Sequence, residues 1–305
     1  MSAIVQTFLN PIFPIFTMML IGMVLGKRKV FTFSDAQTIN RFVFYGALPP
    51  LVFSLTYGAP LGQLNFTVIG LYFLSEMTVF SLTAILVRSW LNRTISESFL
   101  LGMAACFVNH VFFILPIVTL LYGDPGVLPI SAIITIDTVI VFCGMIMGLE
   151  IASHRGESLD KVAVSLLRNP VLIGVAFGLI FNIGSIDLHG GIVTFLAFAG
   201  KAAPPAALFS LGIIVSGLRI SRIDHGALLV TAMKIVIHPL ALWLLFLMTG
   251  SLDGYWTKSS LLTAAGPCGA MPFVLALQYR VKADSIGAAI IYSTVTSLST
   301  LSIIA

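Results

Sequence analysis

The feature that most constrains this chain is a succession of apolar stretches, each about as long as a bilayer's hydrocarbon core is thick. A helix needs about 20 mostly apolar residues to cross that core. Ten stretches of this kind, numbered spans 1 to 10 in chain order, cover residues 7–26, 37–56, 64–88, 98–122, 129–153, 170–186, 192–217, 226–249, 258–279 and 284–304. Lipid offers no hydrogen-bond partners to a backbone, so such segments cross it as helices. We therefore expect an all-α membrane protein with ten transmembrane helices.

Composition agrees with a bilayer as the main solvent. Hydrophobic residues make up 58% of the chain and charged residues only 9%, against roughly 25% charged residues in soluble domains. The formal charge of +4 does not indicate nucleic-acid binding, because the basic residues lie in short loops without interleaved aromatic residues. Cys106, Cys143 and Cys268 fall inside apolar stretches without metal-ligand spacing, so we expect no metal site and no disulfide framework.

The basic residues predict an orientation. Most of the 16 Lys and Arg residues follow odd-numbered spans, beginning with Lys27, Arg28 and Lys29 after span 1, and basic loops stay in the cytoplasm. No basic residue precedes span 1, so we interpret it as a first helix and not as a cleaved signal. We predict an integral protein of a bacterial inner membrane with both termini outside.

Two spans are interrupted at corresponding places in the two halves of the chain. The interrupting residues are Asn109, His110 and Pro116 in span 4, and Pro267, Gly269 and Pro272 in span 9. A helix broken in this way must direct its freed backbone groups toward protein or a wet cavity. Broken helices at matching positions are typical of transporters, where they mark a site near the membrane midplane. We therefore predict that these six residues contribute to a substrate site.

The two halves also resemble each other in their prolines. Asn10-Pro11 and Asn169-Pro170 open spans 1 and 6, and Pro49-Pro50 in span 2 matches Pro204-Pro205 in span 7. Chance is the alternative, because proline is common in membrane helices. Five spans per half would place the second half upside down relative to the first. The pattern thus predicts two inverted five-helix repeats, residues 1–156 and 157–305.

Charged residues inside the spans are candidates for coupling or charge relay, because a charge at the bilayer centre costs roughly 2.5 to 3.5 kcal/mol or more. These candidates are Glu76, Asp137, Lys234 and His238. Glu76 and Lys234 are 158 residues apart, close to the repeat offset, and they form either a structural ion pair or part of a water-filled path. Lys234 and His238 share a helix face.

Three polar residues allow two interpretations each. Asn109 holds a carboxylate or caps its own freed backbone. His110 is a neutral buried imidazole or a proton relay. Lys201 lies three residues before Pro204, where its ammonium attracts an anionic substrate or snorkels to water; we include it among the predicted substrate-binding residues.

With these residues in view, the whole chain resembles the auxin efflux carrier family of plant and bacterial anion transporters, whose fold is related to that of the bile-acid sodium symporters. The resemblance rests on Asn109 with Phe112 and Pro116 followed by Tyr122-Gly123, on Pro205 with 208-LFSLG-212, and on Pro267 with Ala276, Tyr279, Asp284 and 293-STVTSLSTL-301. Two positions depart from the family pattern: Ile114 replaces a common glycine, and Lys201 adds a charge before the proline pair of span 7.

The resemblance implies a scaffold formed by helices 1, 2, 6 and 7 and a mobile transport domain formed by helices 3–5 and 8–10. Helices 4 and 9 would cross at their breaks. By the same analogy, a homodimer would form through the scaffold helices. The bile-acid relatives use sodium, but their ion-site motif has no match here, so the coupling ion, proton or sodium, stays open.

These observations predict secondary or potential-driven transport of small organic anions by alternating access. The family suggests mono- or dicarboxylates such as malonate or malate as substrates. No P-loop is present, so ATP is not the direct energy source, and we expect no cofactor. No HExxH motif or Gly-x-Ser-x-Gly elbow supports an enzyme. The alternatives are an anion channel and a non-transporting ligand sensor of the same fold.

Overall fold

The computed structural model describes residues 13, 17–153, 159–217, 224–251 and 254–304. This part of the chain is helical, which confirms the all-α prediction, and its only strand-like pairing is one isolated β-bridge. After an apolar helix at Thr17–Lys27, the α-helices are α2 (Phe33–Phe42), α3 (Leu48–Tyr57), α4 (Phe66–Trp90), α5 (Ile95–Cys106), α6 (Leu115–Tyr122), α7 (Asp124–Ile136), α8 (Cys143–Ser153), α9 (Leu159–Arg168), α10 (Pro170–Ile183), α11 (Gly190–Gly200), α12 (Ala203–Ser216), α13 (His225–Ala232), α14 (His238–Thr249), α15 (Tyr255–Ala264), α16 (Met271–Gln278) and α17 (Asp284–Ile304).

Four helical segments are long and apolar enough to cross a membrane: Phe66–Trp90, Pro125–Ala152, Gly190–Ser216 and His225–Thr249. They coincide with spans 3, 5, 7 and 8. The shorter apolar helices Thr17–Lys27, Ile95–Cys106 and Pro170–Ile183 overlap spans 1, 4 and 6. The start of span 1 and the predicted repeat boundary at residue 156 lie outside the described residues. The count of ten stays a prediction.

Wider π-helical turns interrupt several helices just before a proline. The turns η1 (Val43–Ala47), η3 (His110–Ile114) and η5 (Met233–Ile237) each end two residues before a proline, namely Pro49, Pro116 and Pro239. Proline lacks an N–H and crowds the carbonyl one turn earlier, so an α-helix cannot pass through it unchanged. The extra residue of a π turn accommodates that crowding. A fourth π turn, η4 (Asp137–Phe142), joins α7 to α8.

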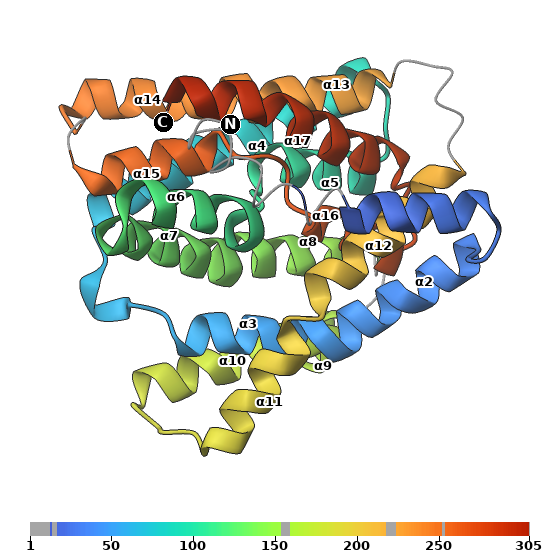
Figure 1. Cartoon of the computed structure of the whole chain (residues 1–305), viewed down its shortest axis with the longest axis horizontal. Helices are drawn as coiled ribbons and strands as arrows, with labels where there is room; N and C mark the ends of the chain where they lie inside the picture. The colour runs from blue at the N-terminus through green and yellow to red at the C-terminus, as the bar shows by residue number, and fades with distance from the viewer. Residues whose placement is uncertain (1–12, 14–16, 154–158, 218–223, 252–253, 305) are drawn as a thin grey trace.

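The helices separate into two groups in Figure 1. α3, α10 and α11 lie together on one side, and α13, α14, α15 and α17 lie on the opposite side. The contact between α3 and α10 is close because α10 carries glycine there: a Cβ on Gly174 would lie 2.7 Å from the carbonyl oxygen of Pro49. α12 continues from α11 past Lys201 and packs along α2.

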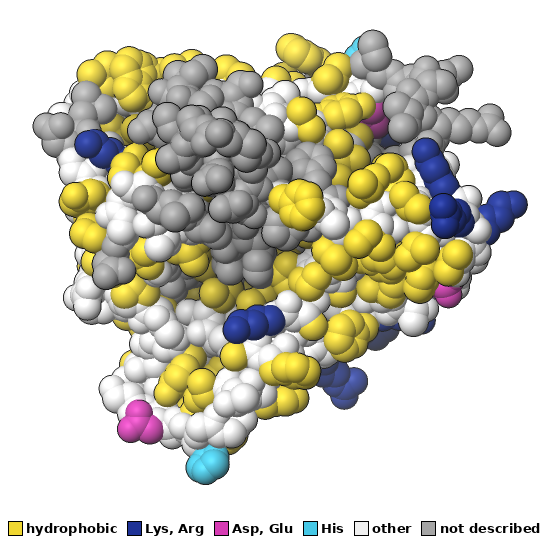
Figure 2. Space-filling view, in the orientation of Figure 1, with side chains coloured by type: hydrophobic (Ala, Val, Ile, Leu, Met, Phe, Trp, Pro, Cys, Tyr) yellow, Lys and Arg dark blue, Asp and Glu magenta, His cyan; other side chains and the backbone are white. Residues whose placement is uncertain are grey.

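Hydrophobic side chains are spread over much of the described surface in Figure 2, while lysine and arginine gather mainly toward one end. Among the most exposed are Phe198 at 80%, Met248 at 83% and Trp90 at 73%. Such exposure would promote aggregation in water. It is the expected surface of helices that face lipid.

Candidate functional site

The two interrupted segments meet each other. α5 ends at Cys106 and helical structure resumes at His110; α15 ends at Ala264 and α16 begins at Met271. We call residues 107–109 and 265–270 the crossing loops. Val108 and Cys268 form an antiparallel bridge. It is flanked by hydrogen bonds from the Asn109 N–H to the Pro267 carbonyl (3.1 Å) and from the Gly269 N–H to the Phe107 carbonyl (2.8 Å). Backbone groups that the broken helices leave free thus satisfy one another.

Local sequence explains why the loops come so close. Pro267 has no N–H to leave unpaired, yet its carbonyl still accepts a hydrogen bond. At Gly269, a Cβ would lie 2.9 Å from the carbonyl oxygen of Val108 and 2.9 Å from the ring of Phe107. No larger residue fits there without a shift of one loop. Each of these two residues therefore has a structural reason for its place.

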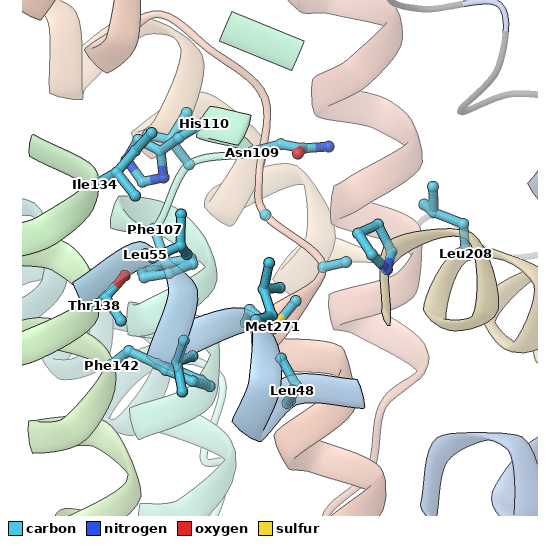
Figure 3. Close-up of a pocket in the computed structure, with 16 residues that line it drawn as sticks. Leu48, Leu55, Phe107, Asn109, His110, Ile134, Thr138, Phe142, Leu208 and Met271 are labelled. Carbon is cyan, nitrogen blue, oxygen red and sulfur yellow. The ribbon is translucent and has the colours of Figure 1, made fainter. Parts of the chain in front are cut away.

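A cavity lies beside the crossing loops (Figure 3). Its walls are mainly apolar. They are formed by Leu48, Leu51, Val52 and Leu55 of α3, Pro204 and Leu208 of α12, Ile134, Thr138 and Phe142 of α7 and η4, and Phe107, Val108, Asn109, His110, Gly269, Ala270 and Met271 at or beside the crossing loops. Among the described lining residues, polar side chains come only from Asn109, His110 and Thr138. A few polar groups on an apolar wall are typical of a small-molecule site.

Asn109 contributes an uncommitted amide. Its side chain is half-buried and caps neither η3 nor any other helix in the described part of the chain. Figure 3 shows the side chains of Asn109 and His110 leaving the loop in opposite directions. The amide therefore retains two donors and an acceptor for a ligand. This placement favours ligand contact over the capping interpretation.

His110 is backed by a carboxylate. Its Nε2 lies 2.6 Å from Oδ2 of Asp137, at an angle outside hydrogen-bond geometry, and the two side chains are 5% and 1% exposed. Asp137 opens η4 and does not line the cavity. The imidazole thus stands between the cavity and a buried acid. The carboxylate of Asp137 can fix the orientation of the His110 ring and stabilise its positive charge when the ring is protonated.

Lys234 and His238 also meet, as their spacing predicted. Lys234 Nζ is 2.8 Å from His238 Nδ1 and donates a 2.8 Å hydrogen bond to the carbonyl of Ala264. Glu76 is fully buried, and its carboxyl group interacts with that of Asp137. Glu76 and Lys234 interact electrostatically, but no direct salt bridge joins them in the described structure. The simple ion pair considered from the sequence does not form.

The other predicted site residues lie at helix ends. Pro272 is buried in the first turn of α16 and does not line the cavity, and the backbone of Pro116 lies in the first turn of α6. Lys201 is the C-cap of α11, exposed and outside the cavity lining. Its position suits the snorkelling interpretation better than substrate contact. Sequence reasoning missed Thr138 and the apolar wall from α3, which no motif distinguishes.

Comparisons with known proteins agree with a transport role. Residues 7–305 match the family model described as membrane transport protein. The chain is 23% identical to a "Putative malonate transporter" of Rhizobium meliloti, over 95% of this chain and 92% of the relative. It is 25% identical to an "Uncharacterized transporter" of Methanothermobacter thermautotrophicus, over 94% of each chain. Auxin efflux carrier component 1 of Arabidopsis thaliana is 30% identical over 44% of this chain and 22% of its own length.

Proposed function

Because the chain belongs to the membrane transport protein family, and is therefore an integral membrane transporter and not an enzyme, we propose that it carries small organic anions by alternating access. The substrates would be mono- or dicarboxylates such as malonate or malate. The observation that carries the proposal is the cavity at the paired crossing loops, with the free amide of Asn109 and the imidazole of His110 on otherwise apolar walls.

The donors at this cavity suit a carboxylate. The Asn109 amide offers two N–H groups, and His110 adds a donor that carries positive charge when protonated. α16 begins at Met271, which lines the cavity, so the positive end of that half-helix faces the same space. The malonate named for one relative is a dicarboxylate of this class. The lining residues that the structure describes include no lysine or arginine, so the charge on His110 would set the preference for anions.

The cavity also lies between the helices of the proposed scaffold and those of the proposed transport domain. α3 and α12 correspond to parts of spans 2 and 7, which the family resemblance assigns to the scaffold. The crossing loops, α7 and η4 correspond to spans 4, 5 and 9 of the transport domain. A substrate bound between these two sets would be exposed to alternate sides when one set moves against the other. We propose this two-domain arrangement for the chain.

The pairing of the loops supports the proposed inverted repeat. Asn109 and Pro267 are hydrogen-bonded and 158 residues apart, the same separation as Glu76 and Lys234. Antiparallel contact between equivalent positions is what a two-fold axis in the membrane plane produces. We accordingly propose two five-helix repeats, 1–156 and 157–305, with both termini outside a bacterial inner membrane. Export of one negative charge would then gain about 2.3 kcal/mol per 100 mV, inside negative.

Counterflow tests the function. Purified protein is reconstituted into liposomes preloaded with unlabelled malonate, and uptake of labelled malonate is followed, with malate and a neutral diol as competitors. A carrier gives transient accumulation that malate inhibits and the diol does not. A channel gives leak without accumulation, and a sensor gives binding without uptake. Either of these last two results would replace the carrier with the corresponding alternative.

A further inference from the structure

Lys234 is a buried cation placed at the end of a broken helix. It is fully buried, and it is the only buried Lys or Arg among the residues that the structure describes. Its Nζ donates to the carbonyl of Ala264, the last residue of α15. The last carbonyls of a helix lack intrahelical partners and carry the negative end of its dipole. The ammonium therefore caps α15 at the point where the crossing loop 265–270 begins.

The second contact of Lys234 is also with an acceptor. His238 Nδ1 lies 2.8 Å from Nζ; when the lysine is charged, that nitrogen must carry the lone pair and the imidazole is neutral. His238 Nε2 has no hydrogen-bond partner in the described structure. The pair thus places one positive charge, and not two, beside the end of α15.

Buried acids lie near this ammonium. Glu76 of α4, Cys106 of α5, Asp137 of η4 and Cys268 of the crossing loop interact with it electrostatically, and His238 contacts it from its own helix. Among the described residues, no cluster of His, Cys, Asp or Glu could hold a metal ion by itself. In transporters with broken helices, carbonyls at half-helix C-termini coordinate the coupling cation. Here the carbonyl at such a helix end accepts a hydrogen bond from a tethered ammonium.

We propose that Lys234 is a built-in counter-ion that takes the place of a free alkali cation at the end of α15, so that anion binding and transport need no sodium. The role is one of positioning, because Lys234 does not line the cavity. It acts through Ala264 on a crossing loop whose Gly269 and Ala270 do line it. The transport part of this inference rests on the proposed anion transport; the cation site itself does not.

The parent protein gives the first test. Affinity for malonate by calorimetry, and counterflow rate, are measured in sodium, potassium and N-methylglucamine chloride at equal ionic strength. We expect values within about twofold of one another, a difference near 0.4 kcal/mol. A tenfold or greater loss without sodium would overturn the proposal. This measurement can overturn the proposal even where no variant at position 234 folds.

Two variants separate charge from packing. Lys234→Ala removes the ammonium and leaves space, and Lys234→Met fills the space without charge. We expect both to have a lower Tm than the parent and to bind malonate at least about tenfold more weakly. Methylammonium or sodium should raise the Tm and restore binding in Lys234→Ala only, because only that variant has room for a free cation. Lys258→Ala, which removes an exposed lysine of α15, should respond to neither ion.

Three results would contradict the proposal: parent-like binding by Lys234→Met, no recovery of folded Lys234→Ala with any small cation, or equal recovery in the methionine variant. The Tm response to methylammonium requires no anionic substrate. If the protein does not carry anions, counterflow fails while this response persists. The two proposals are therefore distinguishable.

Discussion

The backbone N–H of Asn109 donates a 3.1 Å hydrogen bond to the carbonyl of Pro267, so the two interrupted segments of the chain complete each other. Neither break could sit in lipid alone, because each leaves polar backbone groups without partners. Together they form a short antiparallel contact that carries cavity-lining residues on both strands. The same pair of crossing loops therefore satisfies the backbone groups of the broken helices and forms part of the cavity wall.

Gly269→Ala should separate the crossing loops. The new Cβ would lie 2.9 Å from the carbonyl oxygen of Val108, and overpacking of this kind costs about 1 to 3 kcal/mol. We expect a lower Tm and weaker malonate binding, measured by thermal unfolding in detergent and by calorimetry. Gly70→Ala on α4 is the matched control, because a Cβ there meets nothing within 4 Å. Equal effects of the two substitutions would rule out a special role for the loop contact.

Asn109→Ala should lose affinity without losing stability. The amide caps no helix in the described structure, so folding does not depend on it, whereas a hydrogen bond to a charged ligand contributes about 1.5 to 3 kcal/mol. Asn65→Ala is the opposite control: Asn65 caps α4 by accepting from the Val68 N–H, so about 1 kcal/mol of stability is lost with affinity unchanged. A fall in Tm for Asn109→Ala equal to that of the control would support the capping interpretation.

His110 and Asp137 should behave as a coupled pair. Loss of one partner of a buried pair costs about 3 to 5 kcal/mol, because the other is left uncompensated. In the parent, His110 Nε2 lies 2.6 Å from Asp137 Oδ2. His110→Gln and Asp137→Asn should each be strongly destabilising, while the double variant, which replaces this pair by two neutral amides, should lose much less than the sum. Thermal unfolding of the four proteins gives the coupling. Strict additivity within about 0.5 kcal/mol would show that the two residues act independently.

Lys201→Ala should leave malonate affinity within about twofold of the parent, a difference near 0.4 kcal/mol. This expectation reverses the role considered from the sequence, because the side chain is exposed and away from the cavity. Calorimetry on the two proteins is sufficient. A tenfold loss of affinity would return Lys201 to the substrate site and require a conformation in which α11 and α12 approach the crossing loops more closely.

Orientation can be tested with single cysteines in a background without the native three. Asp187→Cys, in the loop after α10, should react with an impermeant maleimide added outside intact cells. Lys282→Cys, in the loop after α16, should react only after permeabilisation. Both parent side chains are exposed, so access to reagent depends on the side of the membrane. The reverse labelling pattern would place the termini in the cytoplasm.

Apolar stretches of the sequence predicted helical type and four long spans correctly, because lipid leaves a backbone few alternatives to a helix. The positions of both breaks were also readable, since proline removes a donor that a spanning helix needs. The contacts of individual side chains were harder to predict from the sequence. Thr138 and the α3 wall reach the cavity only through tertiary packing, and Lys201 was considered for the site although it points elsewhere. Burial of a charge indicates that it needs a partner but does not identify that partner.

The π turn η1 (Val43–Ala47) lets the chain change in length next to the cavity without rebuilding the site. It holds one residue more than an α-helical turn, and the cavity wall from Leu48 to Leu55 follows directly after it. Deleting one residue from a regular α-helix would rotate everything beyond it by about 100°. Deleting the extra residue of a π turn instead removes the bulge and restores α-helical winding, so nearly the same side chains of α3 would still face the crossing loops. A one-residue deletion in η1 should therefore change the cavity far less than the same deletion inside α3.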